Sequence, residues 1–231
     1  MAMGKEEQDR LKMEAAQRAL ALVQPGMAVG LGSGSTATMW IKLLGEKVRD
    51  GGLKIRAIAS SEDSEKLGRS YGIPFTNFDE TKQLDLTVDG ADEVAPGLAL
   101  IKGGGGKLLR EKIVASASKR FVVVVDESKV VEKLGRFPLP VEVIPMAEPL
   151  VSAELRSLGF TPTIRLNKDG SQYITDEGNL ILDCSGMLMD DPAAMAERLD
   201  SIVGVVEHGL FLGMAELVLI AGEGGVTERT R

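Results

Sequence analysis

The chain has 231 residues, of which 44% are apolar and 26% charged, a composition typical of a globular protein with ample length for a packed core. Its formal net charge of −7 leaves no basic surface for nucleic acid, which is not expected as a partner. The single histidine, His208, is given no role, and the single cysteine, Cys184, has no disulfide partner, so we expect no metal site and a reducing, cytoplasmic setting.

The first predicted elements are a helix, a strand and a glycine-rich loop. Apolar residues recur at helical spacing between Glu6 and Val23. The apolar run Met27–Leu31 then predicts a strand that leads through Gly32–Thr36 into another helix. This order directs backbone N–H groups at an anion, which predicts a phosphate or nucleotide site. The alternative is a tight turn in which Ser35 or Thr36 caps the helix.

Strands and helices continue to alternate in the first half of the chain. Ile55–Ala59 and Leu84–Val88 are predicted strands, and the β-branched run Phe121–Val125 is typical of a strand buried on both faces. This alternation predicts an α/β fold with a doubly wound, mostly parallel sheet. We expect a Rossmann-like catalytic domain formed by residues 1–134 and 208–231. No apolar run approaches the roughly 18 residues that cross a membrane, so no membrane partner is expected.

The pattern changes after Leu134. From here a β-α-β-β-α-like order predicts a second, smaller α+β ferredoxin-like domain, residues 135–207, with a hairpin turn at Asn167–Gly170. We expect this domain to provide a surface for oligomerisation. Its predicted elements are strand Val141–Ile144, helix Ala147–Leu158, strands Thr161–Leu166, Ser171–Thr175 and Asn179–Asp183, and helix Ala193–Ser201.

Reactive side chains concentrate in residues 84–112. Asp89 and Asp92 follow a predicted strand, where ligands bind in open α/β sheets; they form either a hydroxyl-binding, proton-sharing pair or a solvated turn. Lys102 precedes four glycines, which suit a backbone that approaches a ligand closely or, alternatively, a floppy surface loop. Glu111 opens the next helix, as a general base or as a surface residue that complements the helix dipole.

Other candidate residues carry weaker signals. Lys129, near a strand end, and Lys12, on the polar side of the first helix, are either ligands of an anion or solvated side chains. Lys107 is predicted to be solvated. Cys184 is predicted to be a small buried apolar residue, and Trp40 a core residue.

Taken together, these segments resemble the type A ribose-5-phosphate isomerase family. Each motif alone is weak, but in this order they are specific, and the resemblance spans nearly the whole chain. Ser33 stands where a threonine is common in the family, and Lys107 where a small residue is usual. The matching pieces are Val29–Thr36, Asp89-Gly90-Ala91-Asp92-Glu93, Lys102–Gly106, Arg110-Glu111-Lys112, Asp126–Lys129 and Leu134–Val143.

The resemblance implies an aldose–ketose isomerase that interconverts D-ribose 5-phosphate and D-ribulose 5-phosphate through an enediolate, without a cofactor or a metal, in the non-oxidative pentose phosphate pathway. It implies Glu111 as the general base, with Asp89, Asp92 and Lys102 acting on hydroxyls, ring opening and the oxyanion. It also implies a homodimer or homotetramer. The implied substrate-binding residues are Lys12, Ser33, Gly34, Ser35, Thr36, Asp89, Gly90, Ala91, Asp92, Lys102, Gly103, Gly104, Gly105 and Lys129.

Other functions remain as alternatives. A non-catalytic sugar-phosphate sensor that regulates transcription would share the α/β domain, but the sequence lacks a helix-turn-helix segment and a basic face. A different sugar-phosphate isomerase or an acyl-CoA transferase of similar architecture is a further possibility. Turnover of ribose 5-phosphate without added metal or nucleotide discriminates among them.

Overall fold

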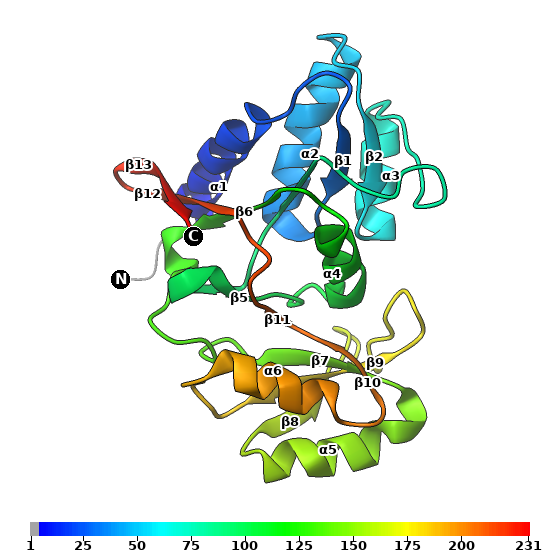
Figure 1. The fold of residues 1–231 in the computed structure, drawn as a ribbon, viewed down its shortest axis with the longest axis vertical. Coiled ribbons are helices and arrows are strands. Elements are labelled where there is room, and N and C mark those ends of the chain that lie inside the picture. Colours follow the sequence, from blue (N-terminus) through cyan, green and yellow to red (C-terminus); the bar gives the residue numbers. More distant parts are fainter. Residues whose placement is uncertain (1–4) are drawn as a thin grey trace. The chain divides into compact units, whose positions relative to one another are not determined.

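The computed structural model describes residues 5–231; residues 1–4, which the sequence assigns to the first domain, lie outside the described part. The chain forms two compact units, each built from discontinuous segments (Figure 1). Unit 1 comprises residues 5–91, 110–130 and 214–231, and unit 2 comprises residues 92–109 and 131–213. Residues 92–109, 131–134 and 208–213 therefore group with unit 2, whereas the sequence analysis placed them in the first domain. Within residues 5–231, no helix combines the length and apolar character needed to cross a membrane.

Unit 1 is built on a 6-stranded sheet with the order β13-β12-β6-β3-β1-β2. All neighbouring strands run parallel except β13, which pairs antiparallel with β12 at one edge. The predicted doubly wound, mostly parallel sheet is confirmed. The strands are β1 (Ala28–Leu31), β2 (Arg56–Ala59), β3 (Leu86–Asp89), β6 (Phe121–Asp126), β12 (Leu217–Gly222) and β13 (Gly225–Thr230).

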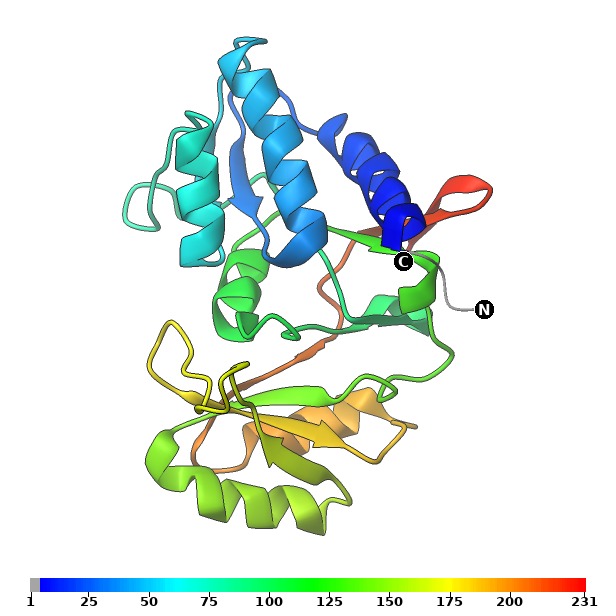
Figure 2. The same cartoon turned by 180° about the vertical axis from the view of Figure 1, so that it is seen from behind.

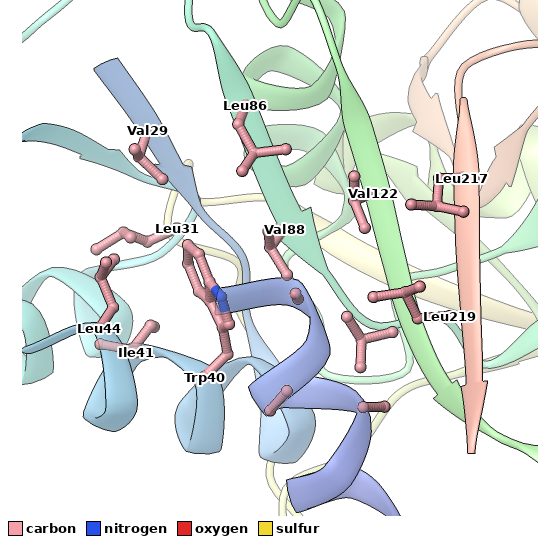
Figure 3. Close-up of a cluster of buried hydrophobic side chains, with 14 of the residues drawn as sticks. Val29, Leu31, Trp40, Ile41, Leu44, Leu86, Val88, Val122, Leu217 and Leu219 are labelled. Atoms are coloured by element: carbon pink, nitrogen blue, oxygen red, sulfur yellow. The ribbon is translucent and has the colours of Figure 1, made fainter. Parts of the chain in front are cut away.

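The strands of unit 1 are buried by helices. α1 (Lys5–Leu20) and α2 (Gly34–Arg49) pack side by side (Figure 2). Side chains alternate along β1, so Val29 and Leu31 join the cluster that contains the fully buried Trp40, whereas Ala28 joins Val114 of α4 (Leu108–Ser116). Figure 3 shows the Trp40 cluster. The core position predicted for Trp40 is confirmed. The remaining helix of the unit is α3 (Glu62–Ser70).

The order of the strands marks one edge of this sheet for binding. The strand β1 has β2 on one side and β3 on the other, so the chain reverses its direction of winding at β1. In open α/β sheets, ligands bind outside the carboxyl ends of the strands at such a switch point. The loops after β1 and β3 are the loops that the sequence analysis selected.

Unit 2 contains an antiparallel sheet with the order β10-β7-β9-β8. Its β-α-β-β-α-β succession, completed by β10, is the ferredoxin-like arrangement expected from the sequence. A second antiparallel sheet has the order β11-β5-β4. The elements are β4 (Glu93–Ala95), β5 (Ala99–Ile101), β7 (Leu139–Val143), α5 (Glu148–Ser157), β8 (Thr161–Ile164), β9 (Leu180–Ser185), α6 (Pro192–Asp200), β10 (Val205–His208) and β11 (Leu210–Phe211), with short 3-10 helices at Pro96–Leu98, Pro145–Ala147 and, in unit 1, Glu127–Lys129.

One predicted strand of unit 2, Ser171–Thr175, is wrong. The predicted turn is present, since the Gly170 N–H donates to the Asn167 carbonyl at 3.0 Å. Beyond it, pairing is limited to an isolated bridge between Leu166 and Gln172, and β8 pairs with β9 instead. Residues 165–179 therefore form a long loop between neighbouring strands.

Candidate active site

The loop after β1 provides backbone groups at the switch point. Ser33 is the N-cap residue of α2, but its side chain makes no capping bond and instead lies 2.9 Å from the Ser60 hydroxyl. The predicted alternative, a cap by Ser35 or Thr36, is therefore wrong. Gly34 has φ +88°, a conformation that glycine adopts without strain. Gly34 and Ser35 are exposed, at the first residues of a 16-residue helix whose N-terminus favours an anion.

Asp89 is the last residue of β3 and is held in a fixed orientation. Its carboxylate is buried, with the residue 1% exposed, and its Oδ1 accepts hydrogen bonds from the backbone N–H groups of Ser33 at 2.9 Å and Gly90 at 2.7 Å. A Cβ on Gly32 would lie 2.3 Å from the Asp89 carboxyl carbon, so only glycine allows this approach. The solvated turn considered for Asp89 is therefore wrong. The loop after β1 and the carboxylate after β3 form one rigid arrangement.

Topology brings Glu111 to the same edge of unit 1. Because β3 and β6 are parallel, the helix α4 that connects them starts at the carboxyl ends of the strands. Glu111 lies in the first turn of α4 and is 5% exposed, so the surface position considered for it is wrong. Lys129 follows β6 at this edge and is half-buried. Lys12 of α1 is also half-buried, with its Nζ 3.4 Å from the Ser35 hydroxyl.

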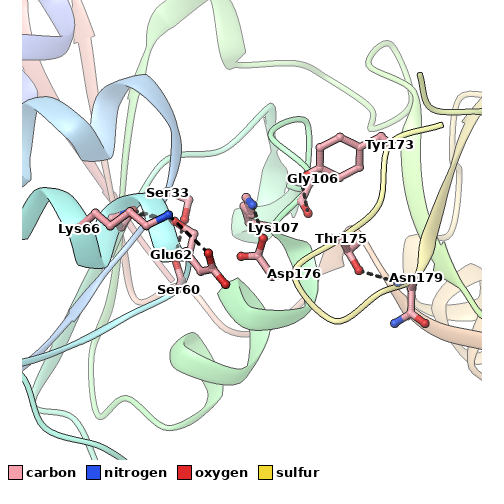
Figure 4. A network of polar contacts seen from close by, with 12 residues as sticks. Ser33, Ser60, Glu62, Lys66, Gly106, Lys107, Tyr173, Thr175, Asp176 and Asn179 are labelled. Carbon is pink, nitrogen blue, oxygen red and sulfur yellow. Dashed lines mark hydrogen bonds and ion pairs between the residues drawn. The ribbon is translucent and has the colours of Figure 1, made fainter. Parts of the chain in front are cut away.

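A group of serines that the sequence analysis did not select supports the loop after β1. Ser60 is fully buried at the end of β2 and contacts Ser33. The Ser64 hydroxyl donates to the Gly32 carbonyl at 2.7 Å and its backbone N–H is capped by Ser61. Figure 4 includes the Ser33–Ser60 contact. These serines could have been selected from the sequence, because the pair Ser60-Ser61 directly follows a predicted strand.

In unit 2, Asp92 and Lys102 flank the short sheet formed by β4, β5 and β11. The Asp92 N–H donates to the Ile101 carbonyl at 2.8 Å, and Asp92 Oδ2 accepts from the Gly104 N–H at 2.7 Å. Lys102 is 2% exposed, and its Nζ lies 5.5 Å from the centre of the Phe211 ring, a cation–π distance. Asp92 thus orients the glycine loop, which we define as Gly103–Gly106.

The glycine loop is closely packed, so its interpretation as a floppy surface loop is wrong. The Gly106 N–H donates to the Gly103 carbonyl at 2.9 Å, which closes a turn. Gly103 and Gly106 have φ of +99° and +79°, and a Cβ on Gly104 would lie 2.5 Å from Asp92 Oδ1. Among residues 5–231, no atom outside its chain neighbours lies within 4 Å of a Cβ built on Gly105. The loop therefore presents exposed backbone at Gly104 and Gly105.

The solvated position predicted for Lys107 is wrong. Its Nζ lies 2.5 Å from Asp176 Oδ1, and the two side chains are only 16% and 14% exposed. Figure 4 shows this pair beside Gly106 and Tyr173. Burial opposes the charge on Lys107, but the hydrogen bond to Asp176 and the charge interactions with Tyr173 and Asp176 outweigh it, so the pKa of Lys107 is raised.

One trio in the described part of the chain has the donor set for a metal ion. Ligand atoms of Asp200, Glu207 and His208 lie within 4.8 Å of one another. His208 Nδ1 accepts from the Leu210 N–H at 3.2 Å, and its Nε2 lies 3.1 Å from Asp200 Oδ1. The imidazole therefore already has a partner on each nitrogen, which explains the buried histidine as a structural residue.

Comparison with known proteins identifies close relatives. The family model described as "Ribose 5-phosphate isomerase A (phosphoriboisomerase A)" matches residues 56–225. A ribose-5-phosphate isomerase A from Roseiflexus sp. (strain RS-1) is 49% identical over 219 residues, covering 94% of both chains. One from Desulfatibacillum aliphaticivorans is 50% identical over 223 residues, covering 96% of this chain and 97% of the relative.

Solved structures agree with the sequence matches. A D-ribose-5-phosphate isomerase in complex with phospho-erythronic acid has a TM-score of 0.94 and 38% identity, covering 99% of this chain and 100% of the other. The ribose 5-phosphate isomerase A of Methanocaldococcus jannaschii has a TM-score of 0.92 and 42% identity, covering 96% and 99% of the two chains. The similarity therefore includes both units of the fold.

Proposed function

We propose, from the premise that this chain belongs to the ribose 5-phosphate isomerase A family, that it interconverts D-ribose 5-phosphate and D-ribulose 5-phosphate. The relatives that carry this name match the chain over nearly its full length. A hydroxyl proton passes between O1 and O2 of the open-chain sugar phosphate, and one carbon-bound hydrogen moves between C1 and C2 as a proton. It requires a base for that proton, donors for the enediolate oxygens and an anchor for the phosphate.

The observation that carries the mechanism is the buried carboxylate at the start of α4. Glu111 is 5% exposed and lies at the edge of the sheet where the strands of unit 1 end. We assign it the role of general base, which takes the proton from C2 of ribose 5-phosphate and returns it to C1. In the reverse direction, by microscopic reversibility, the same carboxyl group takes the proton from C1 of ribulose 5-phosphate and returns it to C2.

Asp89, Asp92 and Lys102 are assigned to the oxygen atoms of the sugar. The two backbone N–H groups on Asp89 Oδ1 hold that carboxylate ready to bind a hydroxyl and assist ring opening. Lys102 supplies a positive charge for the oxyanion of the enediolate, and its burial strengthens that interaction because water screens it little.

Backbone amides and lysines are assigned to the rest of the ligand. The loop Ser33–Thr36 offers the N-terminus of α2 to the phosphate, and Lys12 and Lys129 add positive charge. Gly90 and Ala91, after β3, and Gly103, Gly104 and Gly105, in the glycine loop, provide backbone that approaches the sugar.

The first test is Glu111→Gln, which keeps the shape of the side chain and removes the base. We expect turnover of ribose 5-phosphate, followed as the absorbance of the ketopentose phosphate, to fall by about 10²–10⁴-fold. Glu154→Gln on the exposed side of α5 is the matched control and keeps normal turnover. Near-normal turnover by Glu111→Gln with a native circular dichroism spectrum removes Glu111 from this role. Ligand binding without turnover by the unaltered protein favours the sensor instead.

We further propose that unit 2 mediates homodimer or homotetramer formation and that the enzyme acts in the cytoplasm. Large apolar side chains on unit 2 are exposed to solvent, including Val203 at 93% and Met146 at 88% exposure. Ile144 and Leu150 are also exposed, and the Ile144 N–H donates to the Gly204 carbonyl beside Val203. Such a patch is typical of an interaction surface. The single thiol, buried and without a disulfide partner, suits a reducing compartment.

A further inference from the structure

We propose that the Lys107–Asp176 ion pair is a positioning device that fixes the glycine loop, Gly103–Gly106, to the long loop 165–179 and thereby sets the affinity for the sugar phosphate. Both loops belong to unit 2. The proposal rests on the proposed function, because the position of the glycine loop matters for affinity only if that loop contacts the substrate. It assigns a role to a lysine that the sequence analysis predicted to be solvated.

The pair has the geometry of a strong restraint. Its oppositely charged atoms are 2.5 Å apart and its side chains are 16% and 14% exposed, so solvent screens the attraction little. Lys107 directly follows the glycine loop, whereas Asp176 is 69 residues away in sequence. Removing one partner from a buried pair takes away an attraction that offset the desolvation of the other charge, which favours a local rearrangement.

Contacts on both sides of the pair hold the same loop. A Cβ on Gly106 would lie 2.5 Å from the Tyr173 ring, so this ring packs directly on the backbone at Gly106. Arg165 Nη1 donates to the carbonyls of Gly103 at 2.7 Å and Gly104 at 3.2 Å, and the same guanidinium is fixed by Asp183. Consecutive glycines do not define one backbone conformation by themselves. Side chains of the long loop and β9 therefore define it.

The long loop is itself attached to the sheet of unit 2. Glu142, on β7, accepts hydrogen bonds from the Thr175 hydroxyl at 2.8 Å and from the Asn179 amide at 2.9 Å. These contacts lie on either side of Asp176 in the chain. The sheet, the long loop, the ion pair and the glycine loop therefore form one continuous set of contacts.

This arrangement predicts which kinetic constant changes. Backbone contacts to a bound sugar phosphate are made in the ground state and in the transition state alike, so losing them raises KM and leaves kcat nearly unchanged. A purely structural role would instead reduce the fraction of folded enzyme, which lowers the apparent kcat at constant KM. The two roles are therefore separable in one kinetic experiment.

The test is a double-mutant cycle with Lys107→Met, Asp176→Asn and the double variant, assayed with ribose 5-phosphate. We expect each single variant to raise KM about tenfold with kcat within about twofold, and the double variant to raise it no more than either single one, because the residues act as a pair. Lys133→Met and Asp190→Asn are the matched controls. They remove an ion pair of 2.6 Å whose side chains are 55% and 85% exposed, and should leave KM unchanged.

Hydrogen exchange of residues 103–107, measured by mass spectrometry, provides a readout that does not depend on turnover. Faster exchange in Asp176→Asn supports the positioning role even if the enzyme acts on a different substrate. Unchanged KM and unchanged exchange, or strictly additive effects in the cycle, overturn the proposal. If Asp176→Asn does not fold, KM and hydrogen exchange are measured on Lys107→Gln instead. This variant keeps a hydrogen-bond donor for Asp176. Absence of isomerisation by the unaltered protein counts against the proposed function alone.

Discussion

Glu142 is a carboxyl group 1% exposed inside unit 2. Burial raises its pKa above the ordinary 4.5, and the hydrogen bonds from Asn179 and Thr175 offset this only in part, while Glu177 and Glu207 raise it further. A carboxyl group with a raised pKa in the folded protein stabilises the fold below its unfolded pKa. That contribution is lost as the pH rises through the folded value.

We therefore predict that Glu142→Gln, whose amide oxygen can accept the same two hydrogen bonds, is at least as stable as the unaltered protein at neutral pH. The difference should shrink toward pH 4.5 and below. Thermal unfolding between about pH 4 and pH 8 measures it, with the exposed Glu154→Gln as a control that shows no such trend. Marked destabilisation by Glu142→Gln at neutral pH contradicts the prediction.

Individual side chains also show what the sequence could predict. Asp89 was selected because it follows a predicted strand, and a position at a strand end depends on local sequence alone. The environment of Lys107 was predicted wrongly because it depends on Asp176, 69 residues away in the chain. Local sequence contains no information about a contact with so distant a residue. The same holds for Ser60, whose contact with Ser33 forms only when β1 and β2 pair.

Among the elements, length and pattern decided what was predictable. The run that forms β6 was predicted because Phe121–Val125 is a continuous, mostly β-branched apolar run, which is typical of a strand buried on both faces. The strands β4 and β5 were missed because each contains only three residues, too few for a pattern. Gly209–Phe211 was expected to return to the sheet of the first domain, which is wrong, because Leu210–Phe211 pairs with β5 in unit 2. The predicted strand Ser171–Thr175 is instead part of the long loop, whose polar groups bond to side chains of unit 2.

The helix α6 provides a prediction at this scale. Asp191 is its N-cap, and the Asp191 carboxylate accepts from the Ala194 N–H at 3.0 Å. We expect Asp191→Ala to reduce the free energy of unfolding by about 1 kcal/mol, because one orphan N–H of the helix loses its partner. The neighbouring Asp190→Ala, which removes only an exposed ion pair with Lys133, should cost less than about 0.5 kcal/mol. Equal costs in urea unfolding would show that the cap contributes no more than the exposed ion pair.

For the whole molecule, the chain passes between the units several times, so neither unit is a continuous piece of sequence. The sequence predicted the kind of the 6-stranded and the 4-stranded sheet correctly, because strand–helix alternation and the change of pattern after Leu134 are visible over long windows. The assignment of residues 92–109 to unit 2 depends on the pairing of β5 with β11. These two strands are more than a hundred residues apart in the chain, so local sequence does not reveal the pairing.

The exposed patch on unit 2 gives the prediction for the assembly. Val203→Glu introduces a charge at a residue that is 93% exposed, so folding of the chain should be unaffected. If the patch joins copies of the chain, light scattering after size exclusion should show a smaller species than for the unaltered protein. Lys168→Glu, in an exposed turn of the same unit, is the control and keeps the assembly state. An unchanged mass for Val203→Glu excludes this patch as the interface.

Cys184 gives the molecule a built-in chemical probe. It is the single cysteine of the chain, lies in β9 with 2% exposure, and burial raises its pKa to about 12, so almost no thiolate exists at neutral pH. A thiol-specific dye can therefore label the native protein only during excursions that expose β9. The labelling rate then reports how often that sheet opens, without any engineered tag.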